Sequence, residues 1–220
     1  MQDTRFERLA ARLSLLHTAL VSDALDALGH RSGVMDYRVR AVTAPERLAG
    51  RAFTLATAPI DEPERVPYEK LLGAYPQIRQ GDVLVLATNG ELRSAIWGEL
   101  LSVAARARGA TGAVTDGLTR DVEGISAIRF PVFARGVSPL DSAGRQAVTS
   151  HGTPVVCGGV EVRPGDLILG DAQGVVVIPD ELAEDAVALA EGKRDGEDVV
   201  RDELEQGHDI GEVFARHGIL

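Results

Sequence analysis

Residues 98–121, GELLSVAARARGATGAVTDGLTRD, decide the fold that we predict for this chain. From Glu99 to Arg108 apolar residues recur at helical spacing, and Gly109 is a typical helix end. The GAVT that follows, residues 112–115, is typical of a buried strand. A helix of ten residues rises roughly 15 Å and a strand of about five residues advances roughly 16 Å, so the chain returns to its starting level. The start of the helix should therefore lie beside the end of the strand, at the edge where open parallel sheets bind ligands.

The segments around this unit predict a mixed α/β fold. Short apolar runs bounded by glycine and proline predict strands at 50–58, 82–86, 131–134, 154–156, 160–162, 167–169 and 175–178. Helical spacing and helix-end residues predict helices at 4–28 (with a cap at Ser22 for its last part), 68–75, 121–128, 180–192 and 195–205. We therefore expect one α/β domain over residues 1–220, with a helical C-terminal arm from about 180 to 220.

The composition is that of an ordinary globular protein and argues against several classes. The chain has 220 residues, of which 45% are hydrophobic and 25% charged, which is enough to bury a core. A net charge of −10 argues against a nucleic-acid-binding surface, which needs a basic stripe. No apolar run approaches the roughly 20 residues that cross a bilayer, and the start, MQDTRFERLAARL, lacks a signal-peptide core. The single cysteine, Cys157, allows no internal disulfide. We expect a cytoplasmic protein with neither nucleic acid nor membrane as partner.

Acidic residues and one arginine gather at the predicted sheet edge. Glu99 opens the helix, and Asp116, Arg120 and Asp121 follow the strand. Mg²⁺ prefers carboxylate and water ligands, and proteins usually hold it by one or two carboxylates. Asp121 and Glu99 are the candidate ligands, and Asp116 is either a ligand or a group that orients one. The sequence thus predicts a site for Mg²⁺, or for Mn²⁺, at this edge.

The same edge offers groups that would bind a small 2-oxo acid. Arg120 presents a planar fork of donors. The backbone after Gly98 presents the amides of Leu100 and Leu101, which are free donors at a helix start. A metal would chelate the carboxylate and keto oxygens, and Arg120 would stabilise charge as an enolate forms. The alternative is structural: an acid at a helix start commonly complements the helix dipole, and Arg120–Asp121 can be a surface pair worth under about 1 kcal/mol.

Three longer motifs include this edge and continue beyond it. They are GELLSVAARARGATGAVTDGLTRDVEGI (98–125), FPVFARGVSP (130–139) and TPVVCGGVEVRPGDLILGDAQGVVVIP (153–179). Together they resemble the family named for the regulator of ribonuclease activity A, and the similarity runs from about Val21 to the C-terminus. That family includes metal-dependent 4-hydroxy-4-methyl-2-oxoglutarate / 4-carboxy-4-hydroxy-2-oxoadipate aldolases. These aldolases carry an acid, twenty intervening residues and then Arg-Asp, and Glu99, Arg120 and Asp121 satisfy that count.

The resemblance implies a role for each residue at this edge. Asp121 would be the direct metal ligand, and Glu99 would hold either metal-bound water or the metal itself. Arg120 would contact the keto oxygen of the substrate. The amides of Leu100 and Leu101 would hold the pyruvyl carboxylate.

The resemblance also implies an α/β/β/α sandwich similar to a swivelling phosphohistidine domain, assembled as a homotrimer or hexamer. In such a trimer an acid from the C-terminal arm of a neighbouring subunit enters the site, and Glu197 is the matching residue here. The chain departs from the aldolase pattern at two positions. Glu99 stands where the aldolases have Asp, and Gly124, three residues after Asp121, stands where they often have another acid.

Three functions follow from these observations. The first is a lyase that cleaves a 4-hydroxy-2-oxo acid, of the 4-hydroxy-4-methyl-2-oxoglutarate type, to pyruvate and a carbonyl product, and that decarboxylates oxaloacetate through the same enolate. The second is a non-catalytic regulator that binds a ribonuclease-type protein. The third, a menaquinone-pathway methyltransferase, is a label that members of the resembled family often carry, and it ranks last because the sequence has no glycine-rich loop typical of an S-adenosylmethionine site.

Overall fold

An eight-stranded mixed sheet organises the structure, a computed structural model that describes residues 2–62, 64–66 and 68–219. Its strand order is β1-β7-β5-β3-β2-β12-β13, with β9 also paired to β2. β2, β3, β5 and β7 run parallel, and β1, β9, β12 and β13 are antiparallel to their neighbours. The strands are β1 (Arg40–Ala41), β2 (Leu48–Pro59), β3 (Asp82–Ala87), β5 (Gly112–Thr115), β7 (Val132–Ala134), β9 (Gln146–His151), β12 (Leu167–Asp171) and β13 (Gly174–Ile178).

The alternation of side chains along the central strand β3 divides the core into two layers. Leu84 and Leu86 face the layer that contains helices α3 (Glu69–Ala74), α4 (Glu99–Ala107) and α5 (Val122–Ala127). Val83 and Val85 face the opposite layer, which includes the hairpin of β10 (Val155–Cys157) and β11 (Val160–Val162). Both faces of β3 are thus buried, as is typical of a parallel strand, and this explains its unbroken apolar sequence.

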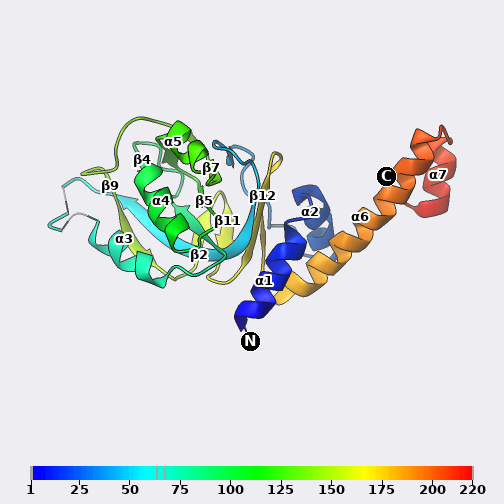
Figure 1. The fold of residues 1–220 in the computed structure, drawn as a ribbon, viewed down its shortest axis with the longest axis horizontal. Coiled ribbons are helices and arrows are strands. Elements are labelled where there is room, and N and C mark those ends of the chain that lie inside the picture. Colours follow the sequence, from blue (N-terminus) through cyan, green and yellow to red (C-terminus); the bar gives the residue numbers. More distant parts are fainter. Residues whose placement is uncertain (1, 63, 67, 220) are drawn as a thin grey trace.

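A third layer of helices covers β12 and β13. Leu167, Leu169, Val176 and Ile178 point toward α1 (Gln2–Leu13), α2 (Thr18–Ala27) and α6 (Ala183–Glu205). Figure 1 shows these three helices grouped on the side of β12 away from α3, α4 and α5. The result is a mixed α/β fold with a C-terminal helical arm, which confirms the predicted fold class.

The C-terminal arm differs from the prediction of two helices separated near residue 193. α6 is one continuous helix that includes both Gly192 and Gly196, and α7 (Ile210–His217) follows it. A glycine inside a helix costs about 1 kcal/mol relative to alanine, which is too little to break a helix packed at both ends. Gly196 also makes room for Ile219, whose Cδ1 would lie 2.6 Å from a Cβ at that position. The outer half of α6 and all of α7 extend away from the sheet (Figure 1).

The predicted N-terminal helix is also two helices, and its predicted cap is wrong. A turn at residues 14–17 separates the two helices, and Ser22 lies inside α2 rather than at its start. The carboxylate of Asp171, at the end of β12, accepts hydrogen bonds from the amide and the hydroxyl of Thr18 at 2.8 and 2.7 Å. A residue far along the chain therefore caps α2, so the local pattern around Ser22 could not locate the helix start.

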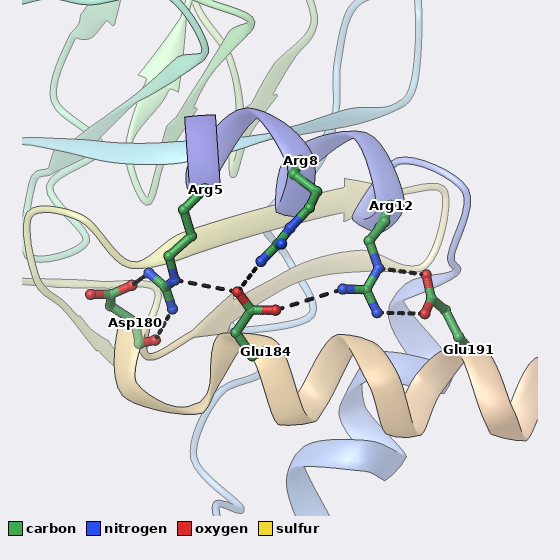
Figure 2. Close-up of polar contacts among 6 residues, drawn as sticks. All are labelled: Arg5, Arg8, Arg12, Asp180, Glu184 and Glu191. Carbon is green, nitrogen blue, oxygen red and sulfur yellow. Dashed lines mark hydrogen bonds and ion pairs between the residues drawn. The ribbon is translucent and has the colours of Figure 1, made fainter. Parts of the chain in front are cut away.

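Ion pairs join α1 to the first half of α6 and to Asp180, which lies just before α6 (Figure 2). Arg5 lies 2.5 Å from Asp180, and Arg8 lies 2.5 Å from Glu184. Arg12 donates two hydrogen bonds to Glu191, at 2.9 and 2.6 Å. These bonds lower the pKa of the Glu191 carboxyl and raise that of the Arg12 guanidinium.

A second, three-stranded parallel sheet was not predicted. Its strands are β4 (Ala95–Trp97), β6 (Leu118–Thr119) and β8 (Gly136–Val137). Each is only two or three residues long, so no alternating pattern marks it in the sequence.

Within the described ranges, no helix combines the length and the apolarity needed to cross a bilayer.

Candidate functional site

The small sheet brings two distant chain segments to one edge. Trp97, the last residue of β4, pairs with Thr119, the last residue of β6. The Arg120 amide and the Thr119 hydroxyl both donate hydrogen bonds to the Trp97 carbonyl, at 3.0 and 3.1 Å. Gly98 and Arg120 are the next residues on the two strands, and α4 and α5 begin just after them. The starts of the two helices therefore lie side by side (Figure 1).

Asp121 lies between the two helix starts. It occupies the N-cap position of α5, without a capping side-chain hydrogen bond, and its φ of 57° lies in the left-handed region that few non-glycine residues adopt. Its Oδ2 accepts a hydrogen bond from the Glu99 amide at 3.3 Å. Gly98 permits this approach, because a Cβ there would lie 2.8 Å from the same oxygen. Strained backbone of this kind clusters at functional sites, and here it aims a carboxylate at the first turn of α4.

A cavity of about 530 Å³ opens at these helix starts. Glu99, Leu100, Leu101, Arg120 and Asp121 all line it, together with residues of α3, β4, β9 and the loop before β9. The volume is within the range of small-molecule sites. The structure thus brings together in one cavity all the residues that the sequence places at one sheet edge except Asp116.

Arg120 lies between two carboxylates at the cavity wall. Its Nε is 3.5 Å from Oδ2 of Asp121, and its Nη1 is 3.8 Å from Oδ2 of Asp141. Both distances exceed those of a charge-assisted hydrogen bond, so the guanidinium keeps donors for a ligand. Sequence analysis missed Asp141, because it lies in a loop that pairs with Ala95 of β4 only through the tertiary fold.

The first turn of α4 supplies backbone donors to the cavity. The amide of Ser102 closes the first helical hydrogen bond, to the Gly98 carbonyl, at 3.1 Å. The preceding amides, of Leu100 and Leu101, have no acceptor within the helix, as at every helix start. The Tyr75 hydroxyl donates to the Leu101 carbonyl at 2.9 Å, and burial raises the pKa of Tyr75, which keeps this donor protonated. The geometry suits the binding of a carboxylate by the two amides.

Asp116 lies apart from this cavity. Its side chain is buried and accepts hydrogen bonds from the Thr88 amide at 2.6 Å, the Thr88 hydroxyl at 2.9 Å and the Gly90 amide at 3.1 Å. It lines a different hollow, with Asp36 and Arg135. The structure therefore gives Asp116 a role in fixing the turn after β3, and it does not bring this residue to Glu99 and Asp121. The Thr88-Asn89-Gly90 turn that ends β3 was the available signal for that role.

Glu197 also lies away from the cavity within a single chain. It belongs to α6, and its carboxylate is 3.8 Å from the Lys193 ammonium, one turn earlier. In Figure 1 the outer half of α6 and the helices α3, α4 and α5 occupy opposite ends of the molecule. The predicted contribution of Glu197 thus requires a second copy of the chain.

Glu99 and Gly124 occupy complementary space. A Cβ at position 124 would lie 2.5 and 3.1 Å from the two carboxylate oxygens of Glu99. The longer acid at position 99 therefore reaches over the first turn of α5, where Gly124 leaves room for it. The two departures from the aldolase pattern compensate each other sterically.

The donor set suits one kind of metal site and not another. Among the residues that the structure describes, no group of three or more His, Cys, Asp or Glu side chains could hold a metal ion. A closed protein cage of the zinc or calcium type is therefore not formed by these residues. Mg²⁺ keeps several waters and needs only one or two carboxylates, which Asp121 and Glu99 could supply. The site fits a hydrated, hard divalent ion.

Comparison with known proteins places the chain in a family. The model of the RraA-like family (Aldolase/RraA) matches residues 18–177, so the chain belongs to this family. A protein of Halalkalibacterium halodurans named "Putative 4-hydroxy-4-methyl-2-oxoglutarate aldolase" is 33% identical over 177 residues, which are 80% of this chain and 79% of that protein.

Two further relatives extend the comparison. Protein DlpA of Legionella pneumophila is 29% identical over 81% of this chain, which spans only 29% of the length of that protein. The crystal structure of Streptomyces coelicolor RraAS2, described as an unusual member of the RNase ES inhibitor RraA protein family, superposes with a TM-score of 0.80. It is 27% identical, and the match covers 89% of this chain and 98% of that one. The relatives thus include proteins named as lyases and proteins named as ribonuclease inhibitors.

Proposed function

We propose that this protein is a divalent-metal-dependent lyase that cleaves the C3–C4 bond of a 4-hydroxy-2-oxo acid and releases pyruvate. The observation that carries the proposal is the convergence of Glu99, Arg120 and Asp121 on one cavity. An inhibitor that acts only through its surface does not need two carboxylates and a guanidinium in a cavity of about 530 Å³. The name of the relative in Halalkalibacterium halodurans supports the same class of reaction.

The residues of the cavity divide the binding of the pyruvyl half between them. The amides of Leu100 and Leu101 hold the carboxylate at the start of α4. Arg120 donates to the keto oxygen, on which negative charge develops in the transition state. Asp121 and Glu99 would hold Mg²⁺ or Mn²⁺, which would supply Lewis-acid chemistry when bound.

The 4-hydroxyl proton must leave as the C3–C4 bond breaks. A water held by Glu99 and Asp121 accepts this proton, and C4 becomes the carbonyl of the second product. The electron pair of the broken bond goes to C3 and forms the enolate of pyruvate, whose charge Arg120 stabilises. C3 then takes a proton back from the same water, so no net proton is gained or lost. Decarboxylation of oxaloacetate would give the same enolate, with carbon dioxide as the second product.

Pyruvate release from purified protein tests the proposal. With Mg²⁺ or Mn²⁺ present, a lactate dehydrogenase-coupled assay should detect pyruvate from 4-hydroxy-2-oxo acids, and a chelator should abolish it. Arg120→Ala should lower kcat by roughly 10²–10³-fold, because it removes a donor to the developing oxyanion. Glu123→Gln is the matched control, since Glu123 is exposed on the same helix, α5, and does not line the cavity. Absence of pyruvate from every such acid would refute the proposal.

A second function, regulation by binding a ribonuclease-type protein, is favoured by the likeness to RraAS2. It predicts that an immobilised ribonuclease E retains the protein, with or without metal. Asp121→Asn separates the two functions: it should abolish pyruvate release, whereas binding through an outer surface would survive.

We also propose that the working form is a homotrimer, or a hexamer built from trimers. The alternative is a monomeric enzyme, in which Glu197 would have no part in the reaction. The proposal rests on the resemblance described above and on the separation of the outer half of α6 from α3, α4 and α5 within one chain (Figure 1).

A further inference from the structure

The cavity has a charged part and an apolar part, supplied by different elements. Glu99, Arg120 and Asp121 lie at the starts of α4 and α5, which adjoin each other. α3 and β9, which also adjoin each other, contribute an apolar wall: Leu71, Leu72, Ala147 and Val148. Leu72 is 60% exposed and Leu100, at the first turn of α4, is 82% exposed, so both present hydrocarbon to whatever enters.

Two polar side chains beside the apolar wall, those of Glu64 and Gln146, have partners within the chain. Glu64 accepts a hydrogen bond from the Tyr68 amide at 3.0 Å. The amide nitrogen of Gln146 donates to the Thr57 hydroxyl at 2.9 Å, and its oxygen accepts from Ser94 at 3.4 Å. Neither side chain supplies a positive charge. This wall therefore offers a ligand dispersion contacts rather than an ionic anchor.

Within one chain, positive charge is confined to one residue of the cavity. Of the described residues that line it, Arg120 is the only cation, whereas Glu64, Glu99, Asp121 and Asp141 are acidic. The neighbouring Arg145 is bonded elsewhere, because its Nη1 donates to the carbonyls of Asp141 and Ala143 at 3.0 and 3.3 Å. Even with a divalent ion bound, the acids outnumber the positive charges.

A dicarboxylate substrate needs a second cation for the carboxylate beyond C4. In the part of the cavity that one chain forms, that group would lie against hydrocarbon or near other carboxylates, and a carboxylate that loses water there without gaining a cationic partner is disfavoured. We infer that the site takes 4-hydroxy-2-oxo acids with a single carboxylate and an apolar substituent on C4. The inference rests on the proposed function and narrows it. The second product is then an aliphatic or aromatic aldehyde rather than a 2-oxo acid such as glyoxylate or pyruvate.

Two isosteric substrates test the inference. 4-Hydroxy-5-methyl-2-oxohexanoate and 4-hydroxy-2-oxoglutarate differ only in an isopropyl group or a carboxylate on C4, and give pyruvate with 2-methylpropanal or with glyoxylate. With Mg²⁺, we expect kcat/KM to favour the isopropyl substrate by at least about 10-fold. Each methylene added to a linear C4 chain should raise kcat/KM by about 4-fold until the wall is covered.

A binding measurement gives a readout that does not depend on cleavage. 5-Methyl-2-oxohexanoate and 2-oxoglutarate lack the 4-hydroxyl and cannot be cleaved by this reaction. Calorimetric titration in the presence of Mg²⁺ should give the lower Kd for the branched monoacid. A lower Kd for 2-oxoglutarate, or a higher kcat/KM for the dicarboxylate substrate, would overturn the inference.

A substitution on the apolar wall should reverse the preference. Leu72→Arg places a cation where the wall is exposed, and should raise kcat/KM for 4-hydroxy-2-oxoglutarate while lowering it for the isopropyl substrate. Leu72→Gln, the matched control, removes hydrocarbon without adding charge, so it should lower kcat/KM for the isopropyl substrate and leave kcat/KM for 4-hydroxy-2-oxoglutarate unchanged. If neither substrate releases pyruvate, the proposed function itself fails; if both do and the dicarboxylate is preferred, only the narrower inference fails.

Discussion

The pairing of Glu99 with Gly124 predicts how the candidate metal site responds to one methyl group. Gly124→Ala adds a Cβ that would lie 2.5 Å from a Glu99 carboxylate oxygen. That carboxylate is the end of a flexible side chain, so it should move rather than unfold the protein, and alanine in α5 gains up to about 1 kcal/mol in helix propensity. We expect an unchanged or higher Tm together with a Kd for Mn²⁺ that rises roughly 10–100-fold. Calorimetric titration with Mn²⁺, alongside thermal unfolding, would measure both.

A double variant provides the control for this prediction. Glu99→Asp shortens the acid by one methylene, so it should relieve the crowding and recover metal affinity in the Gly124→Ala background. If Gly124→Ala alone leaves the Kd for Mn²⁺ unchanged, Glu99 does not hold the ion or its waters.

At the scale of single residues, the sequence predicted the meeting of Glu99, Arg120 and Asp121 but not everything around them. Their convergence follows from the out-and-back path of one helix and one strand, which local periodicity reveals. Asp141 joins them through a loop that pairs with β4, a contact between segments that no local pattern links. The sequence placed Asp116 at the same edge only because it follows the strand at 112–115. In the structure, three hydrogen bonds direct its carboxylate to the turn at Thr88 instead.

Among the elements, α2 depends on a cap from a distant strand, and this predicts a pH-dependent stability. Burial alone would raise the pKa of Asp171, but hydrogen bonds from Thr18 and Gln173 outweigh it and lower the pKa. A lowered pKa in the folded state stabilises the protein above the unfolded value of about 3.9, and this contribution is lost as the pH falls through the folded value. Asp171→Asn should therefore cost roughly 1–3 kcal/mol at pH 7 and progressively less below about pH 4.

Urea unfolding at pH 7 and pH 3 measures that difference. Asp26→Asn, on the exposed side of the same helix, is the matched control and should change the free energy of unfolding by less than about 0.5 kcal/mol at either pH. An Asp171→Asn penalty that is as large at pH 3 as at pH 7 would contradict the assigned role of the carboxylate.

The attachment of α1 tests which interactions hold the helical layer together. Leu13 is fully buried against α6 and the β12–β13 pair, whereas Arg12 forms a partly exposed ion pair with Glu191 (Figure 2). Leu13→Ala should cost about 2–5 kcal/mol. Arg12→Ala should cost less than about 1 kcal/mol and show a smaller effect in high salt. Urea unfolding at two salt concentrations would show whether this order holds; a larger loss for Arg12→Ala would contradict it.

Elements with strong local signals were predicted, and those without them were not. β3, α4 and β5 match their predicted bounds to within a residue, because burial and periodicity coincide there. β4, β6 and β8 are too short to carry a pattern, and they are held in place by pairing with one another. α6 is a case in which a local signal was misleading. Its glycines suggested a break, but packing against α1, α2 and α7 keeps the helix continuous.

For the whole molecule, the position of Glu197 predicts that activity is shared between copies of the chain. The assembly should have three or six times the 23.3 kDa mass of the chain by light scattering. Asp121→Asn and Glu197→Gln should each be inactive alone. Co-expression of the two variants should restore part of the activity, because some cavities in a mixed assembly receive both intact residues from different chains.

The same variants can also contradict the proposal that two chains share one cavity. If Glu197→Gln retains full kcat, or if mixed assemblies stay inactive while each variant still forms the assembly, the arm does not complete the cavity. Lys193→Gln, a substitution one turn earlier on α6, controls for loss of the ion pair with Glu197.

The pairing of Trp97 with Thr119 determines which parts of the chain can change in length. The register of two strand ends aligns Glu99 with Asp121, while α4 and β5 carry the chain to the far side of the sheet and back. Residues inserted in the turn after Gly109, which joins α4 to β5 far from the cavity, would lengthen this part of the chain without disturbing the cavity. A chain with a longer interval between the acid and the Arg-Asp pair would therefore keep the same arrangement at this edge, and a search restricted to a fixed interval would overlook it.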